Sequence, residues 1–430
     1  TGLYSSAASD VYKRQVQHVP PPEVDPDGPL QLQVSSLDYD TYVGVLGIGR
    51  IRRGTLRANA SVSVVAPGGS SRRARVLELY GFHGLQRHKV PSATAGDIVV
   101  FSGIEKLGIS DTLCDPDHEE ALPALTVDEP TVSMTFQVNK SPFAGQDGKY
   151  LTSRQIRERL DQELKHNVAL RVDDTEDPDK FRVSGRGELH LAVLVETMRR
   201  ESFELAVSRP EVIMHEIDGV MHEPWEQLTV DFDEEFQGAV MTRLAERKGE
   251  LVDMLPDGKG RIRLDYRIPT RGLIGFRTEY LTATSGTGLI YHVLDDYAPR
   301  VDGTIAQRNN GALVSNVQGK ALAYALFNLQ ERGRLFIGHG TPVYEGMIIG
   351  IHQRSNDLVV NPTKAKQLTN IRAAGSDENL VLTPPIKYSL EQSLEFLDDD
   401  ELLEVTPTSL RLRKKHLKES DRKREARQAS

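Results

Sequence analysis

The chain has 430 residues, of which 38% are hydrophobic and 27% are charged, and its formal net charge is −9. This length allows two to four domains with separate cores, and this composition excludes a chain that is disordered throughout. No stretch approaches about 18 uncharged apolar residues, so the sequence predicts no membrane-spanning helix and no membrane partner. The single cysteine, Cys114, excludes an internal disulfide and is typical of a reducing compartment such as the cytoplasm.

Residues 1–15, "TGLYSSAASDVYKRQ", do not fit the sequence that follows them. They lack the basic segment followed by an apolar segment that characterises a signal peptide. We interpret residues 1–15 as a non-native cloning or sequencing scar, with native sequence beginning near Val16.

Residues 16–118 predict a small β-barrel domain. After a linker rich in proline and aspartate (residues 19–29), apolar residues alternate in short runs such as "YVGVLGIGRI" and "ASVSVVAP". Glycine or proline turns separate these runs. Five or more short strands at this spacing favour a closed barrel.

Residues 119–210 and residues 211–299 predict two domains of one layout. In the first, the pattern indicates strands at 132–138, 170–173, 181–184 and 203–207, with helices at 152–167 and 188–200. In the second, it indicates strands at 226–232, 250–255, 261–268 and 289–295, with helices at 234–247 and 272–284. The order β-α-β-β-α-β is that of a ferredoxin-like split βαβ domain. The predicted fold class is therefore multidomain α+β.

Residues 300–430 predict a mixed α/β C-terminal domain. A helix at 320–332 precedes the apolar strands "RLFIG" and "MIIGIH", and a long polar stretch spans residues 353–379. A helix at 390–397, one strand around "LLEVTPTSLRLR" and a basic tail follow. A polar stretch of this length inside a domain is usually either functional or disordered.

The loop from Arg354 to Arg372, "RSNDLVVNPTKAKQLTNIR", is a candidate RNA-binding segment. Its cations are suited to phosphates, its amide and hydroxyl side chains are suited to base edges or ribose, and a single carboxylate, Asp357, interrupts it. It has no aromatic residue for stacking, which favours contact with a backbone rather than with unpaired bases. The alternative is an ordinary solvated loop.

Charge is divided unevenly near the C-terminus. Residues 391–404 contain seven carboxylates and no lysine or arginine, whereas residues 407–430 contain nine Lys/Arg and three Asp/Glu. A basic arm on an acidic body can bind phosphate locally, and the alternative is a disordered solubilising tail. We interpret the acidic run from Asp398 to Glu401 as a solvated surface rather than a cation site.

No motif in the chain predicts catalysis or a resident metal. "SGRGELHL" at residues 184–191 offers two glycines at the start of a helix, a weak sign of an anion-binding turn, but no Lys-Ser/Thr follows, so it is not a P-loop. No Ser/His/Asp or Cys/His constellation and no HxxxH or CxxC spacing occurs. We predict no catalytic residue, no metal site and no cofactor site in this chain.

Longer segments resemble the BipA/TypA family of translational GTPases. The resemblance extends from Val16 to about Arg427. It is strongest in "FRVSGRGELHLAVLVETMRRESFELAVSRP", "TRGLIGFRTEYLTATSGTG", "GHGTPVYEGMIIGIHQRSNDL", "LTNIRAAGSDE" and "LEFLDDDELLEVTPTSLRLRKKHL". The last three segments lie in the domain that distinguishes this family from elongation factor G and LepA.

The resemblance implies a domain division and a set of RNA contacts. Residues 16–118 would be domain II, 119–210 domain III, 211–299 domain V, and 300–430 the family-specific RNA-binding domain. Gln367 stands where relatives commonly have a lysine. The implied RNA-binding residues come from the loop and from the tail: Arg354, Asn356, Asp357, Lys364, Lys366, Thr369, Asn370, Arg372, Arg411, Arg413, Lys414, Lys415 and His416.

The resemblance also implies a function and partners. The family acts in assembly of the 50S subunit and in adaptation to stress or cold, and its expected partners are the 50S or 70S ribosome, 23S rRNA and A-site tRNA. The chain would be monomeric off the ribosome and cytoplasmic. GTP and magnesium would bind a G domain that this sequence does not contain, so the chain itself would not be an enzyme. The alternative function is a protein-interaction module that makes no RNA contact.

Overall fold

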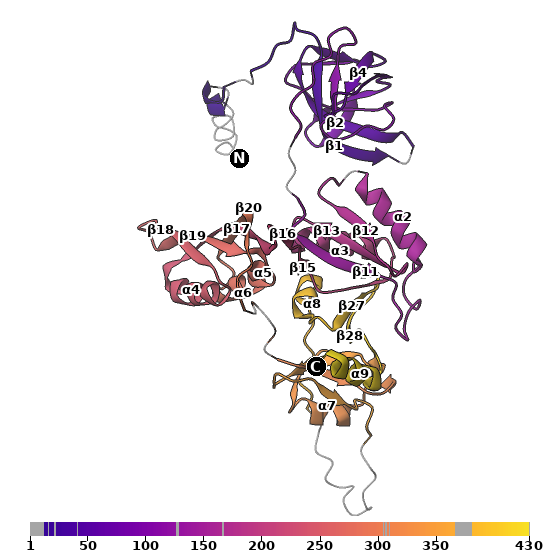
Figure 1. Ribbon diagram of the computed structural model, residues 1–430, viewed down its shortest axis with the longest axis vertical. Helices are drawn as coiled ribbons and strands as arrows, with labels where there is room; N and C mark the ends of the chain where they lie inside the picture. Colours follow the sequence, from indigo (N-terminus) through magenta and orange to yellow (C-terminus); the bar gives the residue numbers. More distant parts are fainter. Residues whose placement is uncertain are drawn as a thin grey trace, which may run out of the picture. The chain divides into compact units, whose positions relative to one another are not determined.

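The computed structural model describes residues 13–15, 17–20, 23–40, 42–125, 129–165, 167–303, 305, 308, 310–365 and 381–429. The chain divides into two compact units, one formed by Thr1–Val127 with Gln162–Val168 and the other by Asp128–Asp161 with Ala169–Ser430. Figure 1 colours both along the sequence. In the described part of the chain, no helix is both long and apolar enough to cross a membrane.

The first unit is built from short strands. Eight of them form one sheet in the order β5-β4-β10-β1-β2-β9-β6-β7, and β3 pairs with β8. Alternate residues of these strands point inward to one core, which includes Leu32, Val64 and Phe101. The strands are β1 (Gln31–Asp40), β2 (Gly44–Arg53), β3 (Thr55–Arg57), β4 (Ser61–Val65), β5 (Ser71–Arg75), β6 (Leu79–His83), β7 (Gln86–Lys89), β8 (Ser92–Thr94), β9 (Ile98–Phe101) and β10 (Thr112–Cys114).

The second unit begins with a β-α-β-β-α-β arrangement. It consists of β11 (Val132–Gln137), α2 (Ser153–Leu164), β12 (Arg171–Asp174), β13 (Lys180–Gly185), α3 (Glu188–Arg200) and β14 (Leu205–Val207), and its sheet runs β12-β13-β11-β14. Helix α3 forms because its apolar residues recur at helical spacing: Leu191, Leu194, Val195 and Met198 are all buried. The short β15 (Glu211–Val212) also pairs with β11.

The same order of elements follows in the next segment. It consists of β16 (His215–Ile217), β17 (Val220–Asp233), the 3₁₀ turn η1 (Glu234–Phe236), α4 (Gln237–Glu246), β18 (Glu250–Pro256), β19 (Arg261–Pro269), α5 (Thr270–Leu273), α6 (Phe276–Ala283) and β20 (Leu289–Pro299). The prediction of one helix over 272–284 is wrong. Helix α5 ends because Ile274 has an extended ψ of 120°, and Gly275, with a φ of 72°, precedes α6.

The C-terminal region contributes a small sheet of its own, in the order β23-β25-β21-β26. Its elements are β21 (Ala312–Ser315), β22 (Gly319–Lys320), α7 (Ala323–Leu329), β23 (Gly333–Leu335), β24 (Pro342–Val343), β25 (Ile348–His352), β26 (Leu358–Val360) and α8 (Leu390–Phe396). The helix expected over 320–332 is shorter than predicted, because a β-strand pair precedes it and β23 follows.

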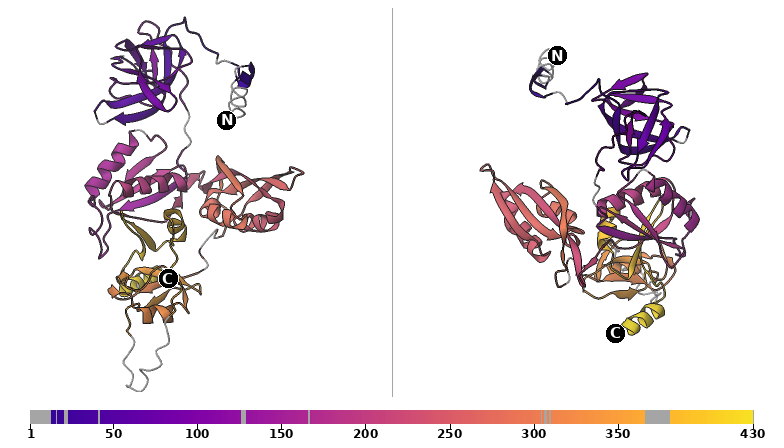
Figure 2. Two further views of the ribbon diagram at one scale, coloured as in Figure 1. Left: turned by 180° about the vertical axis from the view of Figure 1, so that it is seen from behind. Right: turned by 45° about the horizontal axis from the view of Figure 1, so that its top comes forward.

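The last two strands of the chain do not belong to this small sheet but to the first sheet of the unit. The single strand expected around residues 402–413 is a hairpin of β27 (Glu401–Val405) and β28 (Leu410–Lys414). Strand β27 pairs with β14, so the sheet continues β12-β13-β11-β14-β27-β28 across the expected boundary between domains. Figure 1 and the left view of Figure 2 show the hairpin between the two sheets. The basic tail ends in a helix, α9 (Glu419–Ala429).

Candidate nucleic-acid interface

The start of the candidate loop is fixed by its backbone. After β25 the chain turns back at residues 353–357, and the amide of Gly311 donates to the carbonyl of Arg354 at 2.7 Å. Nδ1 of His352 lies 2.6 Å from the carbonyl oxygen of Asn356. A Cβ on Gly311 would lie 2.2 Å from that same oxygen, so only glycine allows this approach. The loop therefore begins on a rigid base.

Asp357 anchors the loop to the rest of the unit. One carboxylate oxygen accepts the Ala312 amide at 2.8 Å, and the other lies 2.5 Å from Nζ of Lys414. Burial alone would raise the pKa of Asp357, but the hydrogen bonds from Lys414 and Ala312 outweigh it and lower the pKa. Asp357 and Lys414 were both predicted to contact RNA, and in this structure they bind each other.

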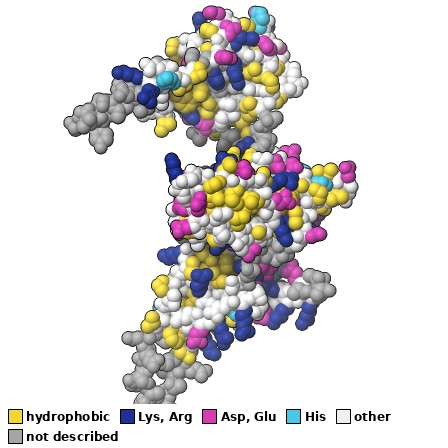
Figure 3. Space-filling view, turned by 90° about the vertical axis from the view of Figure 1, so that its left-hand side faces the viewer, with side chains coloured by type: hydrophobic (Ala, Val, Ile, Leu, Met, Phe, Trp, Pro, Cys, Tyr) yellow, Lys and Arg dark blue, Asp and Glu magenta, His cyan; other side chains and the backbone are white. Residues whose placement is uncertain are grey.

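In the described part of the loop, residues 354–365, the exposed cations are Arg354 and Lys364. Neither side chain forms an ion pair with a residue in the described ranges. Asn356 is also exposed, and its amide nitrogen donates to the carbonyl of Asp357 at 3.2 Å. Figure 3 shows lysine and arginine side chains gathered toward the lower part of one face. Arg354 and Lys364 are thus accessible to a phosphate.

Four predicted site residues lie outside the described residues: Lys366, Thr369, Asn370 and Arg372. Gln367 lies outside them as well. The RNA contacts expected of these residues stay predictions.

Lys414 is buried in a cluster of carboxylates rather than exposed on the tail. Its side chain is 3% exposed, and its Nζ lies 2.9 Å from Glu401 and 2.9 Å from Asp400, in addition to Asp357. Burial would lower the pKa of Lys414, but the charges of Glu401 and Asp400 outweigh it and raise the pKa above its usual value. The ammonium group is therefore neutralised within the protein and is not free to bind a phosphate.

Arg411 and Arg413 point to a second buried carboxylate, Glu404, from the neighbouring strand. Arg413 Nε lies 3.3 Å from one oxygen of Glu404, and Arg411 also pairs with Asp147 at 3.1 Å. Tyr344 donates to the same carboxylate, and burial together with the charge of Glu404 raises the pKa of Tyr344 well above its usual value. Arg413 is 3% exposed and Arg411 is half-buried, so these two basic residues hold the hairpin in place.

Lys415 and His416, by contrast, are exposed. The side chain of Lys415 has no ion-pair partner among the described residues, and Nε2 of His416 lies 3.2 Å from Glu425 of α9. Of the five residues predicted on the tail, these two remain accessible.

The acidic run at residues 398–401 is a solvated surface only in part: Asp399 and Asp400 are exposed, as the sequence indicated, whereas Glu401 is not. Glu401 is fully buried and binds Arg308 through both of its oxygens, each at 2.9 Å. Arg308 in turn lies over the ring of Phe396 at 4.2 Å from its centroid. Sequence reasoning missed this pair because its members are far apart in the chain and neither has a local signal for burial.

Three protein-family profiles match separate regions of the chain. The TypA/BipA C-terminal domain profile matches residues 310–419, which contain the loop and the hairpin. The profile of the elongation factor G C-terminus matches residues 220–308, and that of elongation factor Tu domain 2 matches residues 44–114.

Relatives match nearly the whole chain. The protein named large ribosomal subunit assembly factor BipA of Salmonella typhimurium is 62% identical over 414 residues, which cover 96% of this chain and 68% of the relative. The proteins of that name from Escherichia coli and Haemophilus influenzae are 61% and 60% identical over the same length. At this identity and coverage, the chain belongs to the TypA/BipA family.

Proposed function

We propose that this chain binds the ribosome and acts in assembly of the large ribosomal subunit, through contacts of its C-terminal region with 23S rRNA and A-site tRNA. One observation carries the proposal: the candidate loop begins on a rigid base inside the region matched by the TypA/BipA profile, and its cations Arg354 and Lys364 are exposed and form no ion pair with a described residue. The names of the relatives support the assembly role. The setting would be the cytoplasm, with stress or cold adaptation as the wider role.

The structure supports two different roles for the predicted residues, RNA contact for some and structural anchoring for others. We propose RNA contact for the accessible side chains and for the loop residues outside the described ranges. Asp357, Arg413 and Lys414 instead hold the loop base and the hairpin together. Arg411 shares this role through Asp147. The proposed contact set is Arg354, Asn356, Lys364, Lys366, Thr369, Asn370, Arg372, Lys415 and His416.

Because the chain has a net charge of −9, its affinity for RNA depends on local groups of lysine and arginine side chains. Phosphate binding by a few lysines and arginines releases counterions, so affinity falls as salt rises. Each phosphate contact adds roughly 0.7–0.9 to the slope of log affinity against log salt. The number of contacts can therefore be counted by titration.

We further propose the domain division given by the sequence: a barrel at 16–118, split βαβ domains at 119–210 and 211–299, and an RNA-binding domain at 300–430. The two β-α-β-β-α-β arrangements support the middle pair. No P-loop motif occurs in residues 1–430. We propose that GTP and magnesium bind the G domain of the family, which residues 1–430 do not contain.

The experiment is co-sedimentation of the chain with 50S particles at several salt concentrations. The variant Arg354→Glu/Lys364→Glu is expected to bind at least about tenfold more weakly and with a slope lower by roughly 1.4–1.8, because two phosphate contacts are lost.

The matched control is Lys149→Glu/Lys259→Glu, which makes the same change in charge at exposed residues of the same unit. An equal loss of 50S binding in both variants would mean that overall charge, and not the loop, determines the affinity. Unchanged binding by Arg354→Glu/Lys364→Glu would remove the loop from the interface.

A second candidate function, a protein-interaction module, has its own supporting observation. Val252 on β18 is 68% exposed, and Leu289 and Tyr291 on β20 are each 66% exposed. Figure 3 shows hydrophobic side chains gathered at mid-height on the face turned to the viewer. Exposed apolar patches often mark protein contacts. Capture of a ribosomal protein that survives high salt and RNase would favour this function over RNA binding.

A further inference from the structure

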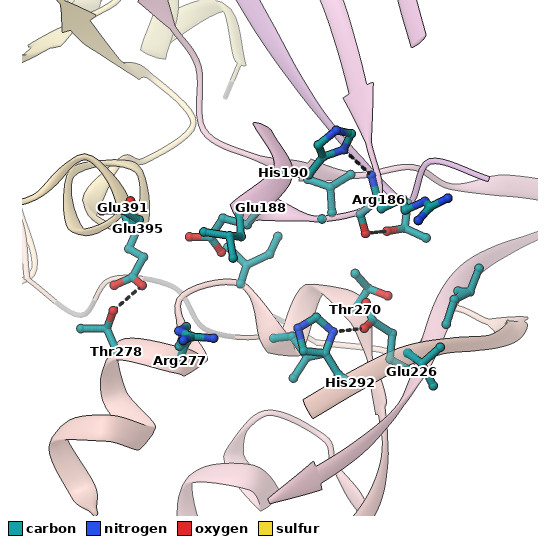
Figure 4. Close-up of a pocket in the computed structure, with 18 of the residues that line it drawn as sticks. Arg186, Glu188, His190, Glu226, Thr270, Arg277, Thr278, His292, Glu391 and Glu395 are labelled. Atoms are coloured by element: carbon teal, nitrogen blue, oxygen red, sulfur yellow. Dashed lines mark hydrogen bonds and ion pairs between the residues drawn. The ribbon is translucent and has the colours of Figure 1, made fainter. Parts of the chain in front are cut away.

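Two cavities of the second unit differ in the charge of their walls. The cavity in Figure 4 is lined by five glutamates, among them Glu188 and Glu395, and by two arginines. Its carboxylates would repel the phosphate of a nucleic acid. A second cavity, of about 430 Å³, has no carboxylate among the described residues that line it. Of the two cavities, the second is the one that suits an anionic ligand.

The second cavity lies beside the β27–β28 hairpin, and we name it the hairpin cavity. Its wall consists of the end of α3, strands β25 and β28, the segment that precedes α8, and α8 itself. Strand β25 leads into the candidate loop, and residues 386–388 follow that loop in the chain. Chain segments from both sides of the candidate loop therefore line the cavity. Of the residues predicted to contact RNA, only Arg411 lies in this wall.

Two aromatic side chains of the wall, Phe336 and Tyr388, are only partly buried. Their ring centroids lie 5.0 Å apart, and both rings also pack against Phe396, at 5.3 Å and 5.8 Å. The amide of Ile386 donates to the carbonyl of Leu335 at 2.8 Å, which ties the two segments that carry the rings to each other. The rings therefore offer a fixed surface on which a planar group can stack.

The start of α8 fixes the position of the segment that carries Tyr388. Ser389 caps the helix: its hydroxyl accepts the Gln392 amide at 3.2 Å, and the Gln392 side chain accepts the Ser389 amide at 3.0 Å. Such a capping box sets the direction in which the chain enters the helix. Lys387 and Tyr388 directly precede this cap, so one ordered segment brings a cation and an aromatic ring to the same cavity.

Lys387 is the accessible cation of the hairpin cavity. Its side chain is exposed and forms no ion pair with a residue in the described ranges. The other two basic residues of the wall are held by carboxylates outside it. Arg199 Nη1 lies 3.0 Å from Glu196, and Arg411 Nη2 lies 3.1 Å from Asp147. A phosphate at this cavity would therefore bind Lys387 and meet no carboxylate in the wall.

Most of the remaining wall is apolar. It consists of Ile337, Met347, Ile348, Ile386, Leu410 and Leu412. Inorganic phosphate would gain nothing from these side chains, and an acidic peptide side chain has no ring to place against the aromatic pair. A nucleotide has both a planar base and a phosphate, and a cavity of this volume is of the size that holds a small molecule.

We propose that the hairpin cavity binds one unpaired nucleotide of RNA. The base lies against Phe336 and Tyr388, and Lys387 binds the phosphate. The candidate loop has no aromatic residue, so the cavity supplies the stacking surface that the loop lacks. This inference rests on the proposed function, because the loop holds the RNA whose unpaired nucleotide enters the cavity.

The test is isothermal titration of the full chain, without ribosomes, at constant ionic strength. Adenosine 5′-monophosphate is the probe, and ribose 5-phosphate is its analogue without a base. One molecule of the probe is expected to bind per chain, at least about fivefold more tightly than ribose 5-phosphate, because only the probe has a base to stack. Single-stranded pentaadenylate should displace the probe. Equal binding of ribose 5-phosphate would overturn the proposal, and failure of pentaadenylate to displace the probe would overturn RNA as the source of the nucleotide.

Two variants separate stacking from charge, and each has a matched control. Tyr388→Leu and Lys387→Gln should each weaken binding of the probe at least about fivefold. The controls are Tyr324→Leu, at a partly buried tyrosine of α7, and Lys320→Gln, at an exposed lysine of β22, and neither residue lines the cavity. An equal loss in a variant and its control would contradict the proposal.

The outcomes for the cavity and for the proposed function can be distinguished. Arg354→Glu/Lys364→Glu, which is expected to lose 50S binding, should bind adenosine 5′-monophosphate as the parent chain does, because neither residue lines the cavity. A chain that binds 50S particles but not adenosine 5′-monophosphate would overturn the inference about the cavity and leave the proposed function in place.

Discussion

Lys414 shows how the role of a basic residue depends on its surroundings. It lies on β28 in the run "RLRKK", where sequence alone favours a solvated cation. Its neighbours in space are three carboxylates that come from the loop base and from the acidic run before β27. Lys415, one residue later, is exposed and has no such partners in the described residues. Adjacent lysines therefore lie in different environments.

Replacement of Lys414 by alanine should destabilise the second unit by about 1–3 kcal/mol, because the buried Glu401 and the partly exposed Asp357 and Asp400 would then lose the cation that they share. Lys415→Ala, the matched control, should change the free energy of unfolding by less than about 0.5 kcal/mol. Urea unfolding followed by circular dichroism measures both. Similar stability of the two variants would mean that the Lys414 cluster is not a stabilising element.

Glu395 gives the unit a dependence on pH. Burial raises its pKa from the usual 4.5 to about 7, the nearby Glu188 and Glu279 act in the same direction, and Thr278 and Arg247 act against it. The folded state holds this proton more tightly than the unfolded state does. The stabilisation is therefore complete below about pH 4.5 and is lost as pH rises toward about 7.

Glu395→Gln resembles the protonated side chain at every pH. It should be more stable than the parent above pH 7, by on the order of 2 kcal/mol, and equally stable near pH 4.5. Thermal unfolding between pH 4.5 and pH 8 measures this difference, with the exposed Glu246→Gln as the control. A difference that grows toward acid pH instead would show that the carboxylate is stabilised in the folded state.

At the scale of elements, the β27–β28 hairpin ties the C-terminal region to the first sheet of the unit. Strand β27 is buried and pairs with β14 from Leu205↔Val405 to Val207↔Leu403, and β28 pairs with β27. Phe143 adds to this link, since it packs edge-on against Tyr344 at a centroid distance of 5.0 Å. Strands from the first half of the unit and from its C-terminal hairpin thus belong to one continuous sheet.

Native-state hydrogen exchange should reveal this cooperation. The amides of β14, β27 and β28 are expected to lose protection together as denaturant rises, since they belong to one sheet, while α9 exchanges first because its side chains are largely exposed. Loss of protection in β27 and β28 well before β14 would show that the hairpin is a separable element.

Elements with a strong local pattern could be predicted from the sequence. Helix α3 was predicted with its observed ends, because its apolar residues recur at helical spacing and glycines precede it. The two β-α-β-β-α-β orders of elements could be predicted from the sequence for the same reason. The pairing of β14 with β27 was not predictable, since the two strands are distant in sequence and neither encodes its partner.

The candidate site was predictable in composition but not in contacts. The loop was identified by its cations, and Arg354 and Lys364 are accessible as expected. The burial of Arg413 and Lys414 was not predictable, because a run of basic residues carries no sign of the carboxylates that face it. Three-dimensional proximity alone distinguishes anchoring cations from accessible ones.

At the scale of the whole molecule, the division into two compact units predicts two unfolding transitions. Phe101 lies in the core of the first unit and Phe232 in a core of the second, and both are fully buried. Phe101→Ala should lower one transition by on the order of 10 °C and leave the other unchanged, and Phe232→Ala should do the reverse. Differential scanning calorimetry tests this, and a single transition lowered by both variants would show that the units unfold as one.

The pairing of β14 with β27 also imposes a delay during synthesis. Roughly 200 residues separate the two strands, so at about 5–20 residues per second a nascent chain waits roughly 10–40 s before the partner of β14 exists. Throughout that interval the sheet presents the open edge of Leu205–Val207, which is buried in the finished protein. During synthesis, the edge of β14 is therefore open to wrong pairing until β27 has been made. Conditions that slow translation lengthen the time for which a chaperone would have to cover this edge.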